Sequence, residues 1–176
     1  MLLLLLACRP TPSPSEEACD ACGGACLQSF APAESRQHTT DPVDYPEYPP
    51  MSGNHDPCWA EWGIYTEPLR TENWVHNLEH GGVVVVYDPA LAAEDVASLT
   101  TWASGLPEGR VILTPASEAF DGQVAAMAWE RKIVLGCVDT DALDTFFWDH
   151  VGQGPEDLTT NPSATCSMEE TGDSGG

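Results

Sequence analysis

The clearest run of β-branched residues in the chain is V-V-V-V-Y at residues 83–87, which carries no charged position. An unbroken run of β-branched side chains predicts a strand that is buried on both faces. Three other apolar runs predict further strands: residues 111–113, 124–129 and 133–135. The last two would form a hairpin, because only three charged residues separate them. The pattern therefore predicts a small sheet of about four strands.

Two stretches have the spacing of amphipathic helices. Residues 92–104 place Val96, Leu99 and Ala103 on one side and carry acidic residues early. Residues 142–150 are apolar on one side and follow an Asp-Thr-Asp sequence that can cap a helix. After residue 80 the order is strand, helix, three strands, helix. We therefore expect one α+β domain, with a mixed sheet that carries the two main helices on one face and a long irregular N-terminal loop region.

The segment before the buried strand is the most distinctive part of the chain. His76 and His80 are four residues apart, so that a helical turn would direct both imidazoles to the same face. Gly81 and Gly82 follow at once, and glycine ends helices because it adopts the left-handed conformation at little steric cost. Two histidines are thus expected at the start of a core strand, an arrangement that suits a metal site or a proton-handling site.

A second unusual segment, residues 48–65, combines Pro, Gly and His with several aromatic residues. A rigid loop of this composition either lines a site or covers a core. His55 lies in this loop and is the natural third ligand beside His76 and His80. His38 lies in a stretch without periodicity and is expected to be a solvated loop residue.

The charge of the chain restricts its partners. There are 28 Asp and Glu residues against 6 Lys and Arg, which gives a formal net charge of −22. Such a surface repels phosphate backbones and anionic lipid headgroups, so nucleic-acid binding is not expected. The acidity by itself indicates solubility.

Cysteine usage and the N-terminus both point to an exported protein. Seven cysteines are many for a reduced compartment, and the start M-L-L-L-L-L-A-C resembles the site at which bacterial lipoproteins are cleaved and acylated. We therefore expect Cys8 to carry a lipid that anchors the protein in the bacterial envelope, at the outer membrane or the periplasmic face. Six cysteines then remain for disulfides, and a bridge between Cys58 and Cys137 would join the aromatic loop to a strand end.

Composition divides the chain into five segments. They are a lipoprotein signal peptide (1–8), a Pro/Ser linker (9–18), a Cys-rich extension (19–44), the α+β domain (45–156) and an acidic, Gly-rich tail (157–176). The cysteine cluster of the extension could bind zinc, but no second C-x-x-C accompanies it, which favours disulfides.

Three histidines are the number that a zinc or copper site uses when one position stays open. His55, His76 and His80 form this candidate set, and Glu72, Glu79 and Glu130 could orient imidazoles as acceptors. Met51 lies in the aromatic loop and could add a soft ligand for copper.

Residues 76–80 also spell H-x-x-E-H, the motif with which inverted zinc peptidases supply two ligands and a glutamate base. Those enzymes carry the motif on a long core helix, whereas two glycines end this helix at once. In a regular helix Glu79 would also face only partly toward His76.

The blocks P-P-M-S-G-N-H-D-P-C-W-A-E-W-G-I-Y, V-H-N-L-E-H-G-G, A-W-E-R and G-Q-G-P-E resemble a family of bacterial secreted or membrane-anchored proteins, domain of unknown function 3105. The resemblance covers residues 45–156, and V-H-x-L-E-H-G is its specific part. It implies that His55, His76, Glu79 and His80 belong to one family motif. It implies no activity.

The sequence thus predicts an exported, lipid-anchored domain with a copper or zinc site at His55, His76 and His80. The alternative is a metal-free binding module of the envelope, in which the histidines order a groove lined by aromatic residues. The groove would use Trp59, Trp62, Tyr65 and Trp74. A metal-dependent hydrolase is a third possibility, and whether the protein is an enzyme stays open.

Overall fold

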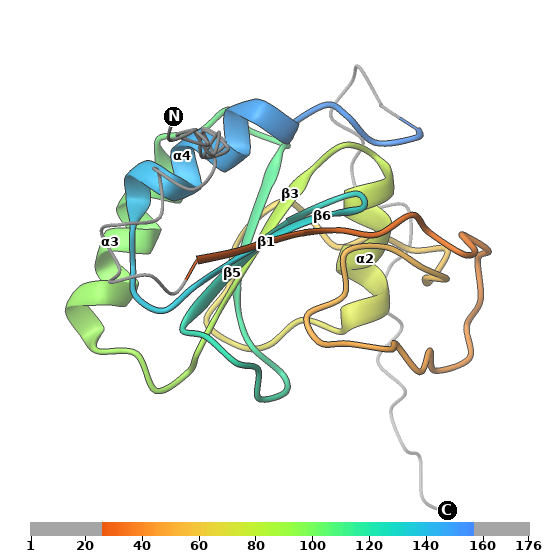
Figure 1. Cartoon of the computed structure of the whole chain (residues 1–176), viewed down its shortest axis with the longest axis horizontal. Coiled ribbons are helices and arrows are strands. Elements are labelled where there is room, and N and C mark those ends of the chain that lie inside the picture. The colour runs from red at the N-terminus through yellow and green to blue at the C-terminus, as the bar shows by residue number, and fades with distance from the viewer. Residues whose placement is uncertain (1–25, 157–176) are drawn as a thin grey trace, which may run out of the picture.

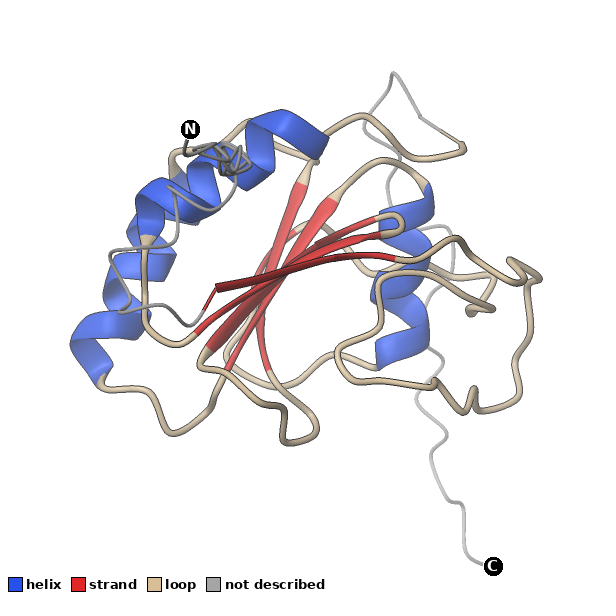
Figure 2. Cartoon of the chain, viewed as in Figure 1, coloured by secondary structure: helices blue, strands red, loops and turns tan. Residues whose placement is uncertain are grey.

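The computed structural model describes residues 26–156 of the chain, whose elements form one mixed sheet flanked by helices (Figures 1 and 2). In chain order the elements are β1 (Cys26–Phe30), β2 (Gly63–Ile64), α2 (Thr71–Glu79), β3 (Val83–Tyr87), α3 (Ala93–Ser104), β4 (Val111–Pro115), β5 (Val124–Ala128), β6 (Arg131–Leu135) and α4 (Thr140–His150). The α+β class and the predicted element order after residue 80 are confirmed.

The sheet has six strands in the order β1-β6-β5-β3-β4-β2, rather than the four that the sequence predicts. Strand β3 lies inside the sheet, parallel to β4 and antiparallel to β5. Both unpredicted strands lie at the edges of the sheet, where β1 pairs with β6 and β2 with β4. An edge strand needs no continuous apolar run, and β2 is only two residues long, so neither has a recognisable sequence pattern.

Alternate residues of β3 supply two separate hydrophobic cores. Val83 and Val85 pack with α3 and α4 on one face, whereas Val84 and Val86 pack with α2 and the irregular segments on the other. Figure 1 shows α3 and α4 together on one side of the sheet and α2 on the opposite side. The two predicted main helices do share a face. The sequence prediction omitted that the His76 segment is itself a nine-residue helix covering the other face.

The predicted boundaries agree fully for β3, whereas β6 and α4 each begin two residues before the predicted residues 133 and 142, and β4 ends two residues after 113. Strand β3 has the predicted bounds, and all five of its residues are buried. Helix α4 begins after Asp139, whose carboxylate accepts hydrogen bonds from the backbone amides of Asp141 and Ala142. That contact satisfies amides that have no partner inside the helix.

Several sequence predictions fall on residues 1–25 and 157–176, outside the described part of the chain. They include the signal peptide, the lipid anchor at Cys8, the linker and the acidic tail. Within residues 26–156, no helix combines the length and the apolar character needed to cross a bilayer.

Candidate metal centre

Helix α2 is unusual because polar side chains make up much of its buried surface. Every residue from Glu72 to Glu79 is buried, although charged and amide side chains are rarely so unless they are paired. The amide of Asn77 bonds both the N–H and the C=O of Ala60, each at 2.9 Å, and Asn73 donates to the carbonyl of Cys58 at 2.6 Å. These bonds hold the aromatic loop against the helix.

The end of α2 is set by the two predicted glycines, for two different reasons. Gly81 has φ 77°, a left-handed conformation that strains other residues. Gly82 lies so close to the ring of Trp62 that an added Cβ would collide with it. His80, the C-cap of the helix, is therefore held directly before β3.

Four side chains converge beside α2: His38, His55, His76 and Glu79. One ligand atom from each lies within 4.8 Å of the ligand atoms of the other three. Glu79 is central, because its Oε2 lies 2.9 Å from Nε2 of His55 and 3.9 Å from Nε2 of His38. Three imidazoles and a carboxylate are a donor set that suits a transition-metal ion.

Backbone carbonyls orient two of these imidazoles. Nδ1 of His55 bonds the carbonyl of Gly53 at 2.9 Å, and Nδ1 of His76 bonds that of Asp56 at 2.7 Å. Such bonds fix the ring and leave Nε2 for an ion, as is common for metal-binding histidines. Nε2 of His55 is buried and makes no hydrogen bond of normal geometry, although the Glu79 carboxylate is close. Nε2 of His80 is also buried without a hydrogen bond, so it is the contact with Glu79 that sets His55 apart as a candidate ligand.

The environment holds two of the four ligands, His76 and Glu79, in the protonation states that a metal requires. The pKa of His76 is lowered from 6.5 to about 4, chiefly by burial, with a smaller contribution from the nearby histidines and an opposing one from the hydrogen bond to the Asp56 carbonyl. Burial alone would raise the pKa of Glu79, but the contacts with His55, His76 and Arg36 outweigh it and lower that pKa. At neutral pH His76 is thus neutral and Glu79 ionised, as ligation demands.

The structure brings His55 and His76 together as predicted, but it does not place His80 in the convergent set. The His80 ring stacks on that of His76 with centroids 4.6 Å apart, and its Nδ1 bonds the carbonyl of Glu156 at 3.0 Å. The shared helical face was therefore inferred correctly. Stacking on a ligand, however, does not make the second ring a ligand.

Two residues in the set were not among the three metal ligands that the sequence suggested. Glu79 was expected to face only partly toward His76, yet its side chain is buried within the group. His38 was expected to be a solvated loop residue, and it is half exposed, but its ring lies 4.8 Å from that of His76. Backbone pairing places it there, because Thr39 donates to the His55 carbonyl and His55 to that of Gln37. The residues around His38 show no sequence pattern that predicts this backbone pairing.

The other proposed site residues lie elsewhere. Glu72 accepts from the Val43 amide and pairs with Arg70, and Glu130 accepts from the Ala33 amide. Met51 is buried in the core on the α2 face. None of these three belongs to the convergent group. The bridge between Cys58 and Cys137 stays a prediction.

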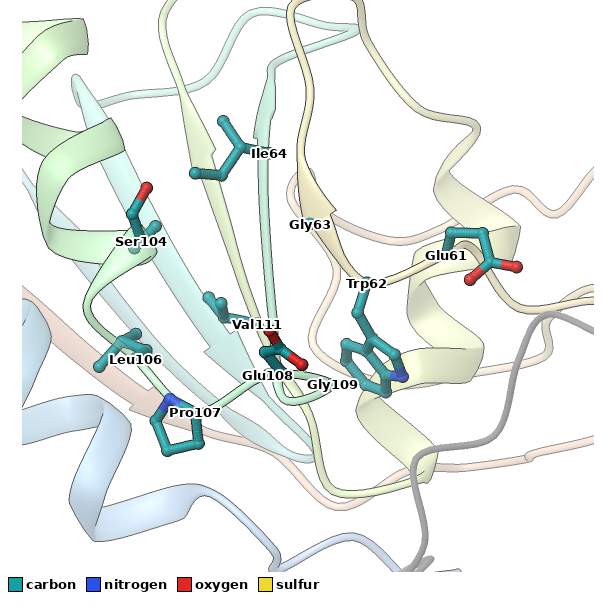
Figure 3. A pocket seen from close by; sticks show the side chains of 11 residues that line it. Glu61, Trp62, Gly63, Ile64, Ser104, Leu106, Pro107, Glu108, Gly109 and Val111 are labelled. Atoms are coloured by element: carbon teal, nitrogen blue, oxygen red, sulfur yellow. The ribbon is translucent and has the colours of Figure 1, made fainter.

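The aromatic residues proposed to line one groove have different positions. Trp74 is buried in the core, and Trp59 lies edge-on to His76 and His80. Trp62 lines a cavity of about 560 Å³ between β2 and the end of α3, opposite Leu106 and Pro107 (Figure 3). No histidine lines this cavity.

Comparison with known proteins identifies the family and nothing more specific. The family model described as protein of unknown function (DUF3105) matches residues 36–167, which is most of the chain. The chain belongs to this family, as its motifs suggested. No curated protein and no solved structure matches the chain.

Proposed function

We propose that this domain binds one divalent transition-metal ion, zinc or Cu(II), through His38, His55, His76 and Glu79. The observation that carries the proposal is the convergence of four ligand atoms within 4.8 Å of one another. Without an ion, these four polar or charged groups would lose part of their hydration, and their contacts with one another would not fully replace it. An ion replaces those lost contacts with coordinate bonds.

The donor set argues for a divalent ion rather than a cuprous one. Cu(I) prefers sulfur ligands, and Met51, the one sulfur donor suggested for the site, is packed in the core instead. Imidazole nitrogen and carboxylate oxygen suit zinc and Cu(II). The strongly acidic chain also attracts cations.

The same arrangement weakens the peptidase interpretation of H-x-x-E-H. In that interpretation Glu79 is a free base beside two zinc-binding histidines. Here Glu79 lies within the convergent group, which supports a role as ligand rather than free base, and His80 bonds the Glu156 carbonyl. We infer that binding the ion is the function. An ion-free protein would instead support a metal-free binding module in which the histidines order the aromatic loop around Trp59.

The test is metal content by mass spectrometry on the full chain purified without a polyhistidine tag, after reconstitution with zinc and with copper. We compare the wild type with His76→Ala and His80→Ala. The second variant is a matched control, since His80 is a buried neighbour in contact with the same ring but outside the set. We expect near-stoichiometric metal in the wild type and His80→Ala, and its loss in His76→Ala.

Absence of metal from the wild type after reconstitution would refute the proposal. Equal loss in both variants would restore His80 as a ligand. Circular dichroism checks that each variant is folded. Quenching of tryptophan fluorescence by Cu(II) gives a second readout, because the Trp59 ring lies 5.1 Å from that of His76. Location in the envelope through a lipid on Cys8 is part of the same proposal, and mass spectrometry of the membrane-extracted protein tests it.

A further inference from the structure

We propose that the solvent-facing side of this metal site takes an oxyanion, which binds the ion through one oxygen and Arg36 through another. This inference rests on the proposed metal binding and adds the class of exogenous ligand. Three observations support it: the solvent exposure of His38, the positive charge of Arg36 next to it, and the long contacts of Arg36 with Glu79 and Glu156.

Within residues 26–156, the ligand side chains of the site are exposed to solvent at His38. The side chains of His55 and Glu79 are 0% and 2% exposed, whereas that of His38 is 50% exposed. An ion bound by all four residues would therefore meet a small molecule on the His38 side. Arg36 lies two residues earlier on the same segment, with its side chain 51% exposed.

Arg36 is close to the site but loosely paired. Its Nη1 lies 3.3 Å from Oε1 of Glu79 and 3.4 Å from Oε1 of Glu156. Charge-assisted bonds from a guanidinium to a carboxylate are usually about 2.7–2.9 Å long, so neither contact is tight. The remaining N–H groups of the planar fork can donate hydrogen bonds to a second pair of oxygens.

Backbone hydrogen bonds fix the main chain of the segment that carries this guanidinium. The amide of Gln37 donates to Oδ1 of Asn54 at 2.9 Å, and the amide of His55 donates to the carbonyl of Gln37 at 3.1 Å. The segment that carries Arg36 and His38 is thus tied to the loop that carries His55. A ligand would meet a preformed pair of contacts, which reduces the entropy cost of binding.

The charge balance changes sign when an ion binds. Without an ion, the carboxylates of Glu79 and Glu156 outweigh the guanidinium of Arg36 by one negative charge. A divalent ion held by neutral imidazoles leaves one net positive charge, and a single anion neutralises it. The rest of the chain is acidic and repels anions. An anion would therefore bind here only if it contacts both the ion and the Arg36 guanidinium.

The experiment uses the full chain loaded with Co(II), whose visible spectrum reports changes in coordination. Sodium acetate and inorganic phosphate are titrated separately, and imidazole is the neutral ligand for comparison. The variants are Arg36→Gln and a matched control, Arg131→Gln. The control removes one guanidinium that lies over the ring of Phe30, away from Glu79.

We expect spectral shifts with at least one oxyanion in the wild type and in Arg131→Gln. In Arg36→Gln the oxyanion affinity should fall about tenfold, the effect of losing one partly exposed charge-assisted contact. Imidazole affinity should be unchanged in all three proteins. The tighter of acetate and phosphate identifies a carboxylate or a phosphate ligand.

A cobalt-loaded wild type that binds neither oxyanion would overturn the inference and leave metal binding intact. So would equal oxyanion affinity in Arg36→Gln and the wild type. A protein that takes up no ion at all would overturn both proposals, and its cobalt content reports that failure separately.

Discussion

The two faces of the sheet are built on opposite principles. On the α3/α4 face the core cluster consists of hydrophobic side chains, with Leu99, Leu143 and Phe147 fully inaccessible to solvent. On the α2 face the helix also buries amides, carboxylates and imidazoles, and irregular loops complete the layer. One face is organised to stabilise the fold, and the other to position polar groups.

The difference shows that burying polar side chains lowers the stability of the fold and in return fixes the positions of those side chains. A buried carboxylate or imidazole contributes less to folding than an apolar side chain of similar volume, because it must give up water. The α2 face keeps these groups in place with bonds to the aromatic loop, such as those between Asn77 and Ala60. The apolar core on the α3/α4 face contributes stability that offsets the unfavourable burial of polar groups on the α2 face.

The largest expected effect comes from the apolar face. Phe147→Ala should lower the free energy of unfolding by about 3–5 kcal/mol, since the ring is fully buried and its loss leaves a cavity. Urea denaturation measures the change. Trp148→Ala is the control, because Trp148 is 56% exposed and should matter little. If Phe147→Ala also abolished metal binding in the folded protein, the two faces would not be independent.

The α2 face should respond instead to the ion. Zinc at a free concentration of 100 times its Kd should raise the free energy of unfolding of the wild type by about 2.7 kcal/mol. His76→Ala should show no such gain, whereas His80→Ala should retain it. Thermal denaturation with and without zinc measures the shift. A gain in His76→Ala equal to that of the wild type would place the ion elsewhere.

Acid should destabilise the metal-free protein through the same face. The pKa of His76 is about 4 in the folded state against 6.5 ordinarily, so the unfolded chain takes up the proton first as the pH falls. The stabilising contribution of neutral His76 is complete above pH 6.5 and disappears as the pH falls through about 4. Between these limits the wild type should lose about 1–2 kcal/mol more than His76→Gln, allowing for partial screening by solvent.

Urea denaturation across this pH range, with EDTA present, measures that loss. His150 on α4 provides a comparison from the other face, because burial lowers its pKa as well. His150→Gln should therefore change the pH dependence in the same direction. Identical pH profiles for the wild type and His76→Gln would contradict the prediction.

The smallest effect concerns the start of α4. Asp139→Ala should cost about 1 kcal/mol, because the carboxylate caps two backbone amides of the first turn. Asp141→Ala is the matched control, since Asp141 lies in the same turn but accepts neither of those bonds. Denaturant titration of the two variants distinguishes capping from a general effect of negative charge near the helix start. Equal losses would argue against the cap.

Sequence patterns predicted the apolar face closely and the polar face only in part. The spacing of Val96, Leu99 and Ala103 located α3, and the run at β3 was recognised to the residue. On the polar face the same reasoning found His55 and His76 but chose His80 over His38 and Glu79. Hydrophobic periodicity reports burial of apolar side chains, so it says little about which polar side chains meet.

The sequence by itself determined the parts of this protein that depend on neighbouring residues. Glycines ended α2 after His80, Asp139 started α4, and a β-branched run made the central strand. These features follow from local sterics and periodicity.

Only the tertiary structure decided the ligand set. His38 reaches Glu79 through a backbone pairing with His55, and the edge strands joined the sheet through partners distant in sequence. Such long-range pairing has no local signature, because backbone groups are the same in every residue.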